Sequence, residues 1–247
     1  TTSYTYGTSA YTTCTHGTSM VGQAAGPRNN DGATTGIAYK SNVHFIRACQ
    51  DVVLDKSSER LGVKNALVAM GNMASVKVVS MSVGTPFYSS VLYDGVLYAY
   101  NNGKMLMAAA GTSFSWTSWW GVVYPAAHAQ CVAITGVDES GNTCDSCHDG
   151  DEVDFTIPME RNVNDNRTSL SLAQSGTGPK YIGGSSTATA TAAGIAALVW
   201  SIDPSFTRAE VLNFLTLSSQ YYPGSDSDTG YGNIDAGAAV ILATEGS

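Results

Sequence analysis

The sequence predicts an α/β protein with a three-layer, doubly wound architecture, in which helices cover both faces of a mostly parallel sheet. Apolar strand-like segments alternate with helical segments, and the strands are apolar almost throughout, as in strands buried on both faces. Residues 76–83 and 104–111 are two such strands. Ligands bind such sheets beyond the carboxyl ends of the strands, so we expect Gly84 and Gly111 at the rim of a site.

The first expected helix precedes the first buried strand. Leu61, Leu67 and Met70 lie near helical spacing, which predicts a helix over residues 57–73. The strand over residues 76–83 follows directly, as in a unit of alternating helix and strand.

A second helix is expected over residues 89–101, before the second apolar strand. Leu92, Val96 and Ala99 share one face of it, and Gly103 is a stop signal. This face is expected to pack on the sheet.

The rest of the chain contributes a third apolar strand and two helices. The strand is expected over residues 130–138 and a small-residue helix over residues 187–202. Thr207 and Glu210 stand at the spacing of a capping box, which marks the start of the last helix of this group. No repeat or linker interrupts the chain, so we predict one domain over residues 1–247.

The composition excludes some classes of function. The 247 residues are 43% apolar and carry a net charge of −8, which argues against a nucleic-acid partner. The longest strongly apolar run, residues 192–202, is too short to span a membrane. The surface is rich in Ser and Thr, which favours an extracellular protein. The chain begins at Thr1 rather than Met, so we expect a processed chain or a fragment.

The cysteine count is odd, and two cysteines lie close together. A local disulfide, a zinc site that includes His148 and free thiols are all compatible with the spacing of the last two, although no second close pair completes a four-ligand zinc site. The five cysteines are Cys14, Cys49, Cys131, Cys144 and Cys147.

A histidine and two serines are the candidate catalytic residues. His16 lies among small residues, and Ser185 and Ser186 lie where the small-residue helix is expected to begin. Each has a structural interpretation as well, because a serine in this place is often a helix N-cap.

The motifs around these residues, in their order, resemble those of the subtilisin-like serine peptidases, the subtilases. The histidine motif reads HGTSMVG from His16 to Gly22, and the serine motif reads GSSTA from Gly184. Gly194 lies eight residues after Ser186, as in the family. This register selects Ser186 rather than Ser185, and the resemblance extends from about Cys14 to the C-terminus.

The resemblance implies a serine endopeptidase with a subtilisin-like fold. Ser186 would attack the peptide carbonyl and His16 would be its base. The Ser186 N–H and Thr112 would hold the oxyanion. An extended peptide would pair with the segment Ser82–Gly84, and the Trp-rich segment 113–120 would wall a pocket or simply pack as a loop. The substrate-binding residues implied in this way are Ser82, Val83, Gly84, Ala109, Gly111 and Val123.

Three positions depart from the family pattern. The family's catalytic aspartate precedes the histidine motif, but the 15 residues before His16 contain no Asp or Glu. Thr112 stands where the family has Asn, and Ala190 where it has Pro. Loss of the orienting acid costs about 10⁴ in rate in the best-studied triad, and loss of an oxyanion donor about 10²–10³.

In the family the strand that carries the aspartate lies inside the sheet. Without it two strand edges are left unpaired, so we expect an N-terminal fragment or a second chain to complete both the sheet and the triad. The resemblance also implies a structural calcium site with oxygen ligands from Asn30, Gly32 and Thr34; no cofactor is expected to be required. Two functions remain open: an active endopeptidase, or a catalytically impaired protein that binds peptides or takes part in assembly.

Overall fold

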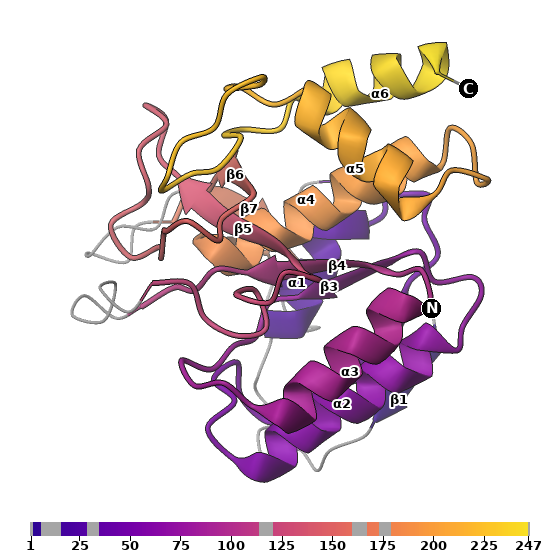
Figure 1. Cartoon of the computed structure of the whole chain (residues 1–247), viewed down its shortest axis with the longest axis vertical. Coiled ribbons are helices and arrows are strands. Elements are labelled where there is room, and N and C mark those ends of the chain that lie inside the picture. The colour runs from indigo at the N-terminus through magenta and orange to yellow at the C-terminus, as the bar shows by residue number, and fades with distance from the viewer. Residues whose placement is uncertain are drawn as a thin grey trace.

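The computed structural model describes most of the chain, and Figure 1 shows its course. The described residues are 2–5, 16–28, 35–113, 121–159, 167–172 and 179–246. The helices within them are α1 (His16–Ala25), α2 (Ser57–Gly71), α3 (Ser90–Asn101), α4 (Ser185–Trp200), α5 (Arg208–Leu217) and α6 (Ala236–Glu245). The strands are β1 (Thr2–Thr5), β2 (His44–Arg47), β3 (Val78–Met81), β4 (Met105–Ala109), β5 (Val132–Val137), β6 (Phe155–Pro158), β7 (Ser169–Ser171) and β8 (Lys180–Ile182).

The expected α/β fold is confirmed, and each expected helix and strand is present with small shifts at its ends. The capping box of α5 forms: the Thr207 hydroxyl accepts from the Glu210 N–H at 3.3 Å, and the Glu210 carboxylate accepts from the Thr207 N–H at 2.7 Å. The small-residue helix begins at Ser185, two residues earlier than expected.

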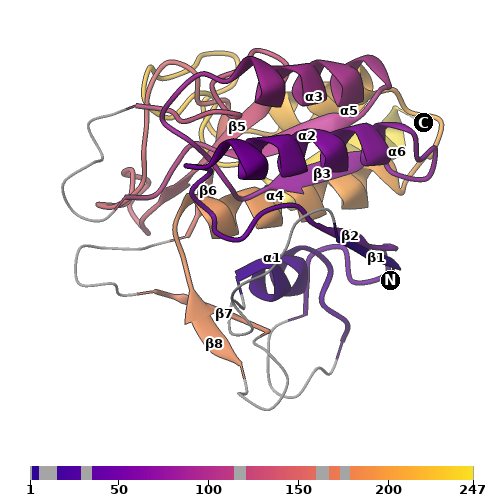
Figure 2. The same ribbon diagram turned by 90° about the horizontal axis from the view of Figure 1, so that it is seen from below.

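A four-stranded parallel sheet in the order β3-β4-β5-β6 forms the centre of the molecule. Successive side chains of a strand point to opposite faces, and β4 follows this rule. Met105 and Met107 pack in the core with α4, α5 and α6, whereas Leu106 and Ala108 pack in the core with α2 and α3. Figures 1 and 2 show these two groups of helices on opposite faces of the sheet.

Helix α4 is buried on almost all sides, which explains its Ala-rich sequence. Ala188 and Ala192 have no exposed surface and lie in the core between α4 and the sheet. Gly194 faces the other way: a Cβ there would lie 2.8 Å from the carbonyl oxygen of Ala24 in α1. Small residues therefore let α4 approach the sheet on one side and α1 on the other, whereas the sequence led us to expect only the contact with the sheet.

Strands β1 and β2 form a separate parallel pair rather than part of the central sheet. An open cleft of about 750 Å³ lies between this pair and the edge of β3, lined mainly by apolar residues of α1, α2, β2, β3 and α4. Figure 2 shows α1, β1 and β2 set below the layer of β3 and α4. Among the described strands, β2 and β3 are therefore not paired with each other, and the missing interior strand stays a prediction.

Candidate active site

The serine motif lies at the N-terminus of α4. Gly184 precedes the helix with φ +85°, a left-handed conformation that favours glycine. Ser185 is 1% exposed, while Ser186 is partly exposed. The first N–H groups of a helix have no acceptor within it, so this end carries a partial positive charge. Of the two serines, Ser186 is the accessible one.

Thr112 contacts the buried serine of this pair. The Ser185 N–H donates to Thr112 Oγ1 at 3.0 Å, and the two hydroxyl oxygens lie 2.7 Å apart. The Gly111 N–H donates to Ser185 Oγ at 3.3 Å. The segment after β4 is thus bonded to the first residue of α4, a contact that the sequence did not predict.

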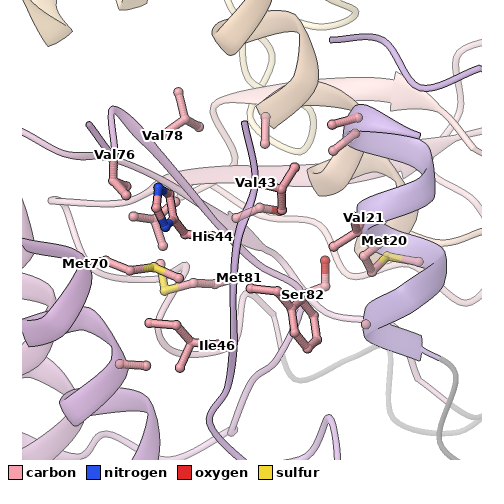
Figure 3. A pocket seen from close by; sticks show the side chains of 18 of the residues that line it. Met20, Val21, Val43, His44, Ile46, Met70, Val76, Val78, Met81 and Ser82 are labelled. Carbon is pink, nitrogen blue, oxygen red and sulfur yellow. The ribbon is translucent and has the colours of Figure 1, made fainter. Parts of the chain in front are cut away.

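Ser82 connects Ser186 to the cleft. Its Oγ donates to the Ser186 carbonyl at 2.8 Å. Ser82 and His16 both line the cleft, and Figure 3 shows Ser82 beside Met20 and Val21 of α1. His16 is the first residue of α1, which packs along α4. The histidine motif thus lines the cleft directly, and the serine motif is linked to the cleft through Ser82. The described residues that line this cleft include one acidic side chain, Asp51, whose carboxylate accepts from the neighbouring Val52 N–H at 2.6 Å.

The expected peptide-pairing segment is partly occupied by the chain itself. The Gly84 N–H donates to the Val52 carbonyl at 2.9 Å, and the Gly84 carbonyl accepts from the Leu54 N–H at 2.8 Å. Gly84 can therefore pair with a peptide only if the segment 52–54 moves. Val83 is partly buried beside it.

The other expected substrate-binding residues lie around the same strand ends. Val123 packs against Gly84, where a Cβ would lie 2.6 Å from its side chain. The Val123 N–H donates to the Ala110 carbonyl at 2.9 Å, and Ala109, 4% exposed, ends β4. Gly111 follows with φ +132°.

His148, a buried histidine that the sequence analysis did not assign to the site, contacts both chain neighbours of Thr112. His148 is 4% exposed, and Ser113 Oγ and its Nε2 are in hydrogen-bond contact. Its Nδ1 lies 2.7 Å from the carbonyl oxygen of Gly121. Burial lowers the pKa of His148, against smaller opposing effects of that carbonyl and of Asp149. The available sequence signal was its place directly after the cysteine pair.

The cysteine pair forms a disulfide, which decides between the three alternatives. Cys144 and Cys147 are bonded to each other, and the described residues contain no group of three or more potential metal-ligating side chains. Cys131 is a buried free thiol, and burial raises its pKa. Cys14 lies outside the described residues.

Two further expectations fall outside the described part of the chain. The calcium ligands Asn30, Gly32 and Thr34 lie in the undescribed segment 29–34, and the Trp-rich segment is undescribed from 114 to 120. Both stay predictions. Within the part that is described, no helix is long and apolar enough to cross a membrane.

Comparisons with known proteins agree with the family resemblance and with the fold. A family model described as "Subtilase family" matches residues 2–232. The chain is 32% identical over 231 residues to a thermostable alkaline protease of Halalkalibacterium halodurans and 31% identical over 227 residues to the minor extracellular protease Epr of Bacillus subtilis. These matches cover 91% and 89% of this chain, which spans 57% and 32% of the two relatives. The structure is similar to that of a Pseudoalteromonas arctica protease, with a TM-score of 0.73 and 26% identity over 92% of this chain and 70% of that one.

Proposed function

The chain belongs to the subtilase family, and on that premise we propose that it is the main part of a serine endopeptidase, with Ser186 as nucleophile and His16 as general base. The observation that supports this most directly is the N-terminus of α4. There Ser186 is accessible, its carbonyl is held by Ser82, and its neighbour Ser185 is buried.

In this mechanism His16 takes the proton of the Ser186 hydroxyl as it attacks the peptide carbonyl, and then gives it to the leaving amine. Water attacks the acyl-enzyme in the second half of the reaction, with His16 again as base. The positive end of α4 and the Ser186 N–H stabilise the negative charge that develops on the carbonyl oxygen.

Thr112 contributes a second oxyanion donor when its hydroxyl proton is free. It already accepts from the Ser185 N–H, so the direction of its bond to Ser185 Oγ decides. If Ser185 donates, Thr112 keeps its own proton for the oxyanion. The Gly111 N–H, which donates to Ser185 Oγ, favours this direction by polarising that hydroxyl as a donor.

The acid that orients His16 comes, in this proposal, from a β-strand that enters the cleft between β2 and β3. A residue in a packed strand takes up about 160 Å³, given a rise of about 3.3 Å, a strand spacing of about 4.8 Å and layers about 10 Å apart. The cleft of about 750 Å³ thus has room for a strand of about five residues, a common strand length.

The lining of the cleft suits such a strand. The facing edges of β2 and β3 both border it, and paired strands would satisfy their backbone groups. His44, labelled in Figure 3, also has a buried Nδ1 without a hydrogen-bond partner among the described residues. The strand belongs to an N-terminal fragment or a second chain, and its Asp would lie at the His16 end of the cleft.

We place the protein outside the cell. The disulfide between Cys144 and Cys147 is typical of oxidising compartments, and one relative is named an extracellular protease. Asn30, Gly32 and Thr34 remain proposed calcium ligands. Their oxygen atoms suit that ion, which would stabilise a loop and take no part in the reaction.

A second function is favoured by one specific observation. Because the backbone of Gly84 is bonded to Val52 and Leu54, the expected peptide-pairing edge is closed. A catalytically impaired protein that uses this scaffold for binding or assembly would not need Gly84 to pair with a substrate peptide.

A fluorophosphonate probe distinguishes the two functions, because it reacts with an activated serine and needs no peptide groove. The native assembly, with every bound segment retained, should be labelled on Ser186, and S186A should lose the label. D51N should keep it, since the proposal gives Asp51 no role. Absence of Ser186-dependent labelling would reject the peptidase. Intact mass and N-terminal sequencing of the same material test the inserted strand, and native material that is labelled on Ser186 while containing this chain alone would rule it out.

A further inference from the structure

We propose that His148, held by the disulfide loop Cys144–His148, is a positioning residue for the segment Gly111–Ser113 and thereby aligns Thr112 with the start of α4. This inference rests on the proposed function, because it gives that alignment a role in holding the oxyanion. It assigns a use to the cysteine pair and its histidine, which no step of the peptidase mechanism employs.

The two segments are paired through their backbones. The Ser113 N–H donates to the Ser146 carbonyl at 2.7 Å, and the His148 N–H donates to the Gly111 carbonyl at 2.9 Å. Thr112 lies opposite Cys147 as an antiparallel bridge. The backbones of both neighbours of Thr112 are therefore held by hydrogen bonds, and the Thr112 side chain contacts Ser185.

The disulfide loop is itself anchored to the central sheet. The Cys144 N–H donates to the Gly136 carbonyl in β5 at 3.0 Å, and the Thr135 hydroxyl donates to the His148 carbonyl at 2.5 Å. The bond between Cys144 and Cys147 closes the loop between these anchors. A loop anchored in this way fixes the segment Gly111–Ser113, called the oxyanion segment below, relative to β5.

The imidazole ring adds a side-chain bond to the same segment. The Gly121 carbonyl can only accept, so Nδ1 carries the proton that is donated to it. In the neutral ring Nε2 is then an acceptor, and the Ser113 hydroxyl donates to it. The ring therefore joins Ser113, the residue after Thr112, to Gly121.

Gly111 is required for the ring to lie where it does. A Cβ at this position would lie 2.5 Å from Nδ1 of His148, and φ +132° is itself unfavourable for other residues. The ring thus packs directly on the backbone before Thr112. The Ser113 contact and this packing restrain the oxyanion segment from both sides of Thr112.

The test removes the hydroxyl that bonds the ring while leaving the ring in place. In the native assembly, S113A should slow fluorophosphonate labelling of Ser186 about tenfold, because the donor at Thr112 is misplaced rather than lost. Backbone hydrogen exchange at Ser113 and His148 should accelerate about tenfold, the change expected for one hydrogen bond. S113T, which keeps the hydroxyl, should restore both, and C144S/C147S should repeat the S113A result.

The matched control is S219A, which like S113A deletes a buried serine hydroxyl. The Ser219 hydroxyl donates to the Leu215 carbonyl at 2.7 Å, away from the proposed site. It should lower the melting temperature about as much as S113A and leave labelling and the two amides unchanged. Unchanged exchange in S113A, or faster exchange with unchanged labelling, would overturn the proposal, as would an equal loss of labelling in S219A. If the parent protein is not labelled at all, the proposed function fails, while exchange still decides whether the ring restrains the segment.

Discussion

The serine side and the histidine side of the candidate site are held in place very differently. On the serine side, Thr112 and Ser82 bond directly to the first two residues of α4, at 2.7–3.0 Å. On the histidine side, α1 begins at His16 and packs along α4, but its neighbours β1 and β2 are separated from the central sheet by a cleft of about 750 Å³. The serine side is therefore part of a continuous sheet, whereas the histidine side borders an open cleft.

The two candidate catalytic residues thus lie in parts of the fold that differ in how completely the described strands are paired. Burial on both faces of β4 and β5 stabilises the serine side without any other chain. The histidine side leaves the edges of β2 and β3 unpaired among the described strands. The predictions below change the two sides separately or compare one with the other.

The largest expected effect comes from the two catalytic residues together. In the native assembly, H16A and S186A should each lower kcat by about 10⁶, the magnitude known for loss of either residue in subtilisin, and the double variant should be no slower. Steady-state hydrolysis of a peptide substrate measures this. If the double variant lost the sum of the two single losses in activation free energy, His16 and Ser186 would not act as one unit.

A matched pair of core substitutions should separate the two sides in stability. Ile134 in β5 has no exposed surface, so I134A should lower the free energy of unfolding by about 2–5 kcal/mol. Ile46 in β2 lines the open cleft, so I46A should cost less than about 1 kcal/mol because the space beside it is already empty.

Urea denaturation of residues 1–247 measures both costs. In the assembly with its inserted strand, the cost of I46A should rise toward that of I134A. An equal cost of the two substitutions in residues 1–247 alone would contradict the difference between the sides.

A smaller effect is expected from the hydroxyl of Thr112. T112V should lower kcat about 10²-fold with KM nearly unchanged, because the Ser186 N–H remains as the other oxyanion donor. T112S keeps the hydroxyl and should stay close to the parent in the same assay. Equal kinetics of T112V and T112S would remove Thr112 from the oxyanion site.

The smallest effect concerns a carboxyl group in the sheet of the serine side. Burial raises the pKa of Asp154 to about 6 from 3.8, against the bond it accepts from the Ala133 N–H. The folded state therefore binds more protons than the unfolded state between about pH 4 and pH 6, and stability is lost as the pH rises through that window.

D154N stays neutral and keeps an acceptor, so it should be about 2–3 kcal/mol more stable than the parent at pH 7 and nearly equal to it close to pH 4. Denaturant unfolding at the two pH values measures this. A difference that does not change with pH would mean that the carboxylate of Asp154 carries no burial cost.

Much of the fold followed from local patterns in the sequence. Apolar strands, helical spacing and the capping box at Thr207 and Glu210 predicted the central elements within a few residues, because these signals act between near neighbours in the chain. The spacing between Ser186 and Gly194, taken with the family resemblance, indicated one of two adjacent serines.

Tertiary structure alone decided the contacts between distant segments. It bonded Thr112 to Ser185, closed the Gly84 edge with Val52 and Leu54, and placed His148 behind the oxyanion segment. No local pattern encodes these contacts, since each joins residues that only the packing of the sheet brings together. The sequence by itself thus determined which residues are candidates, and the packing decided which of them are bonded to the central sheet and which border the open cleft.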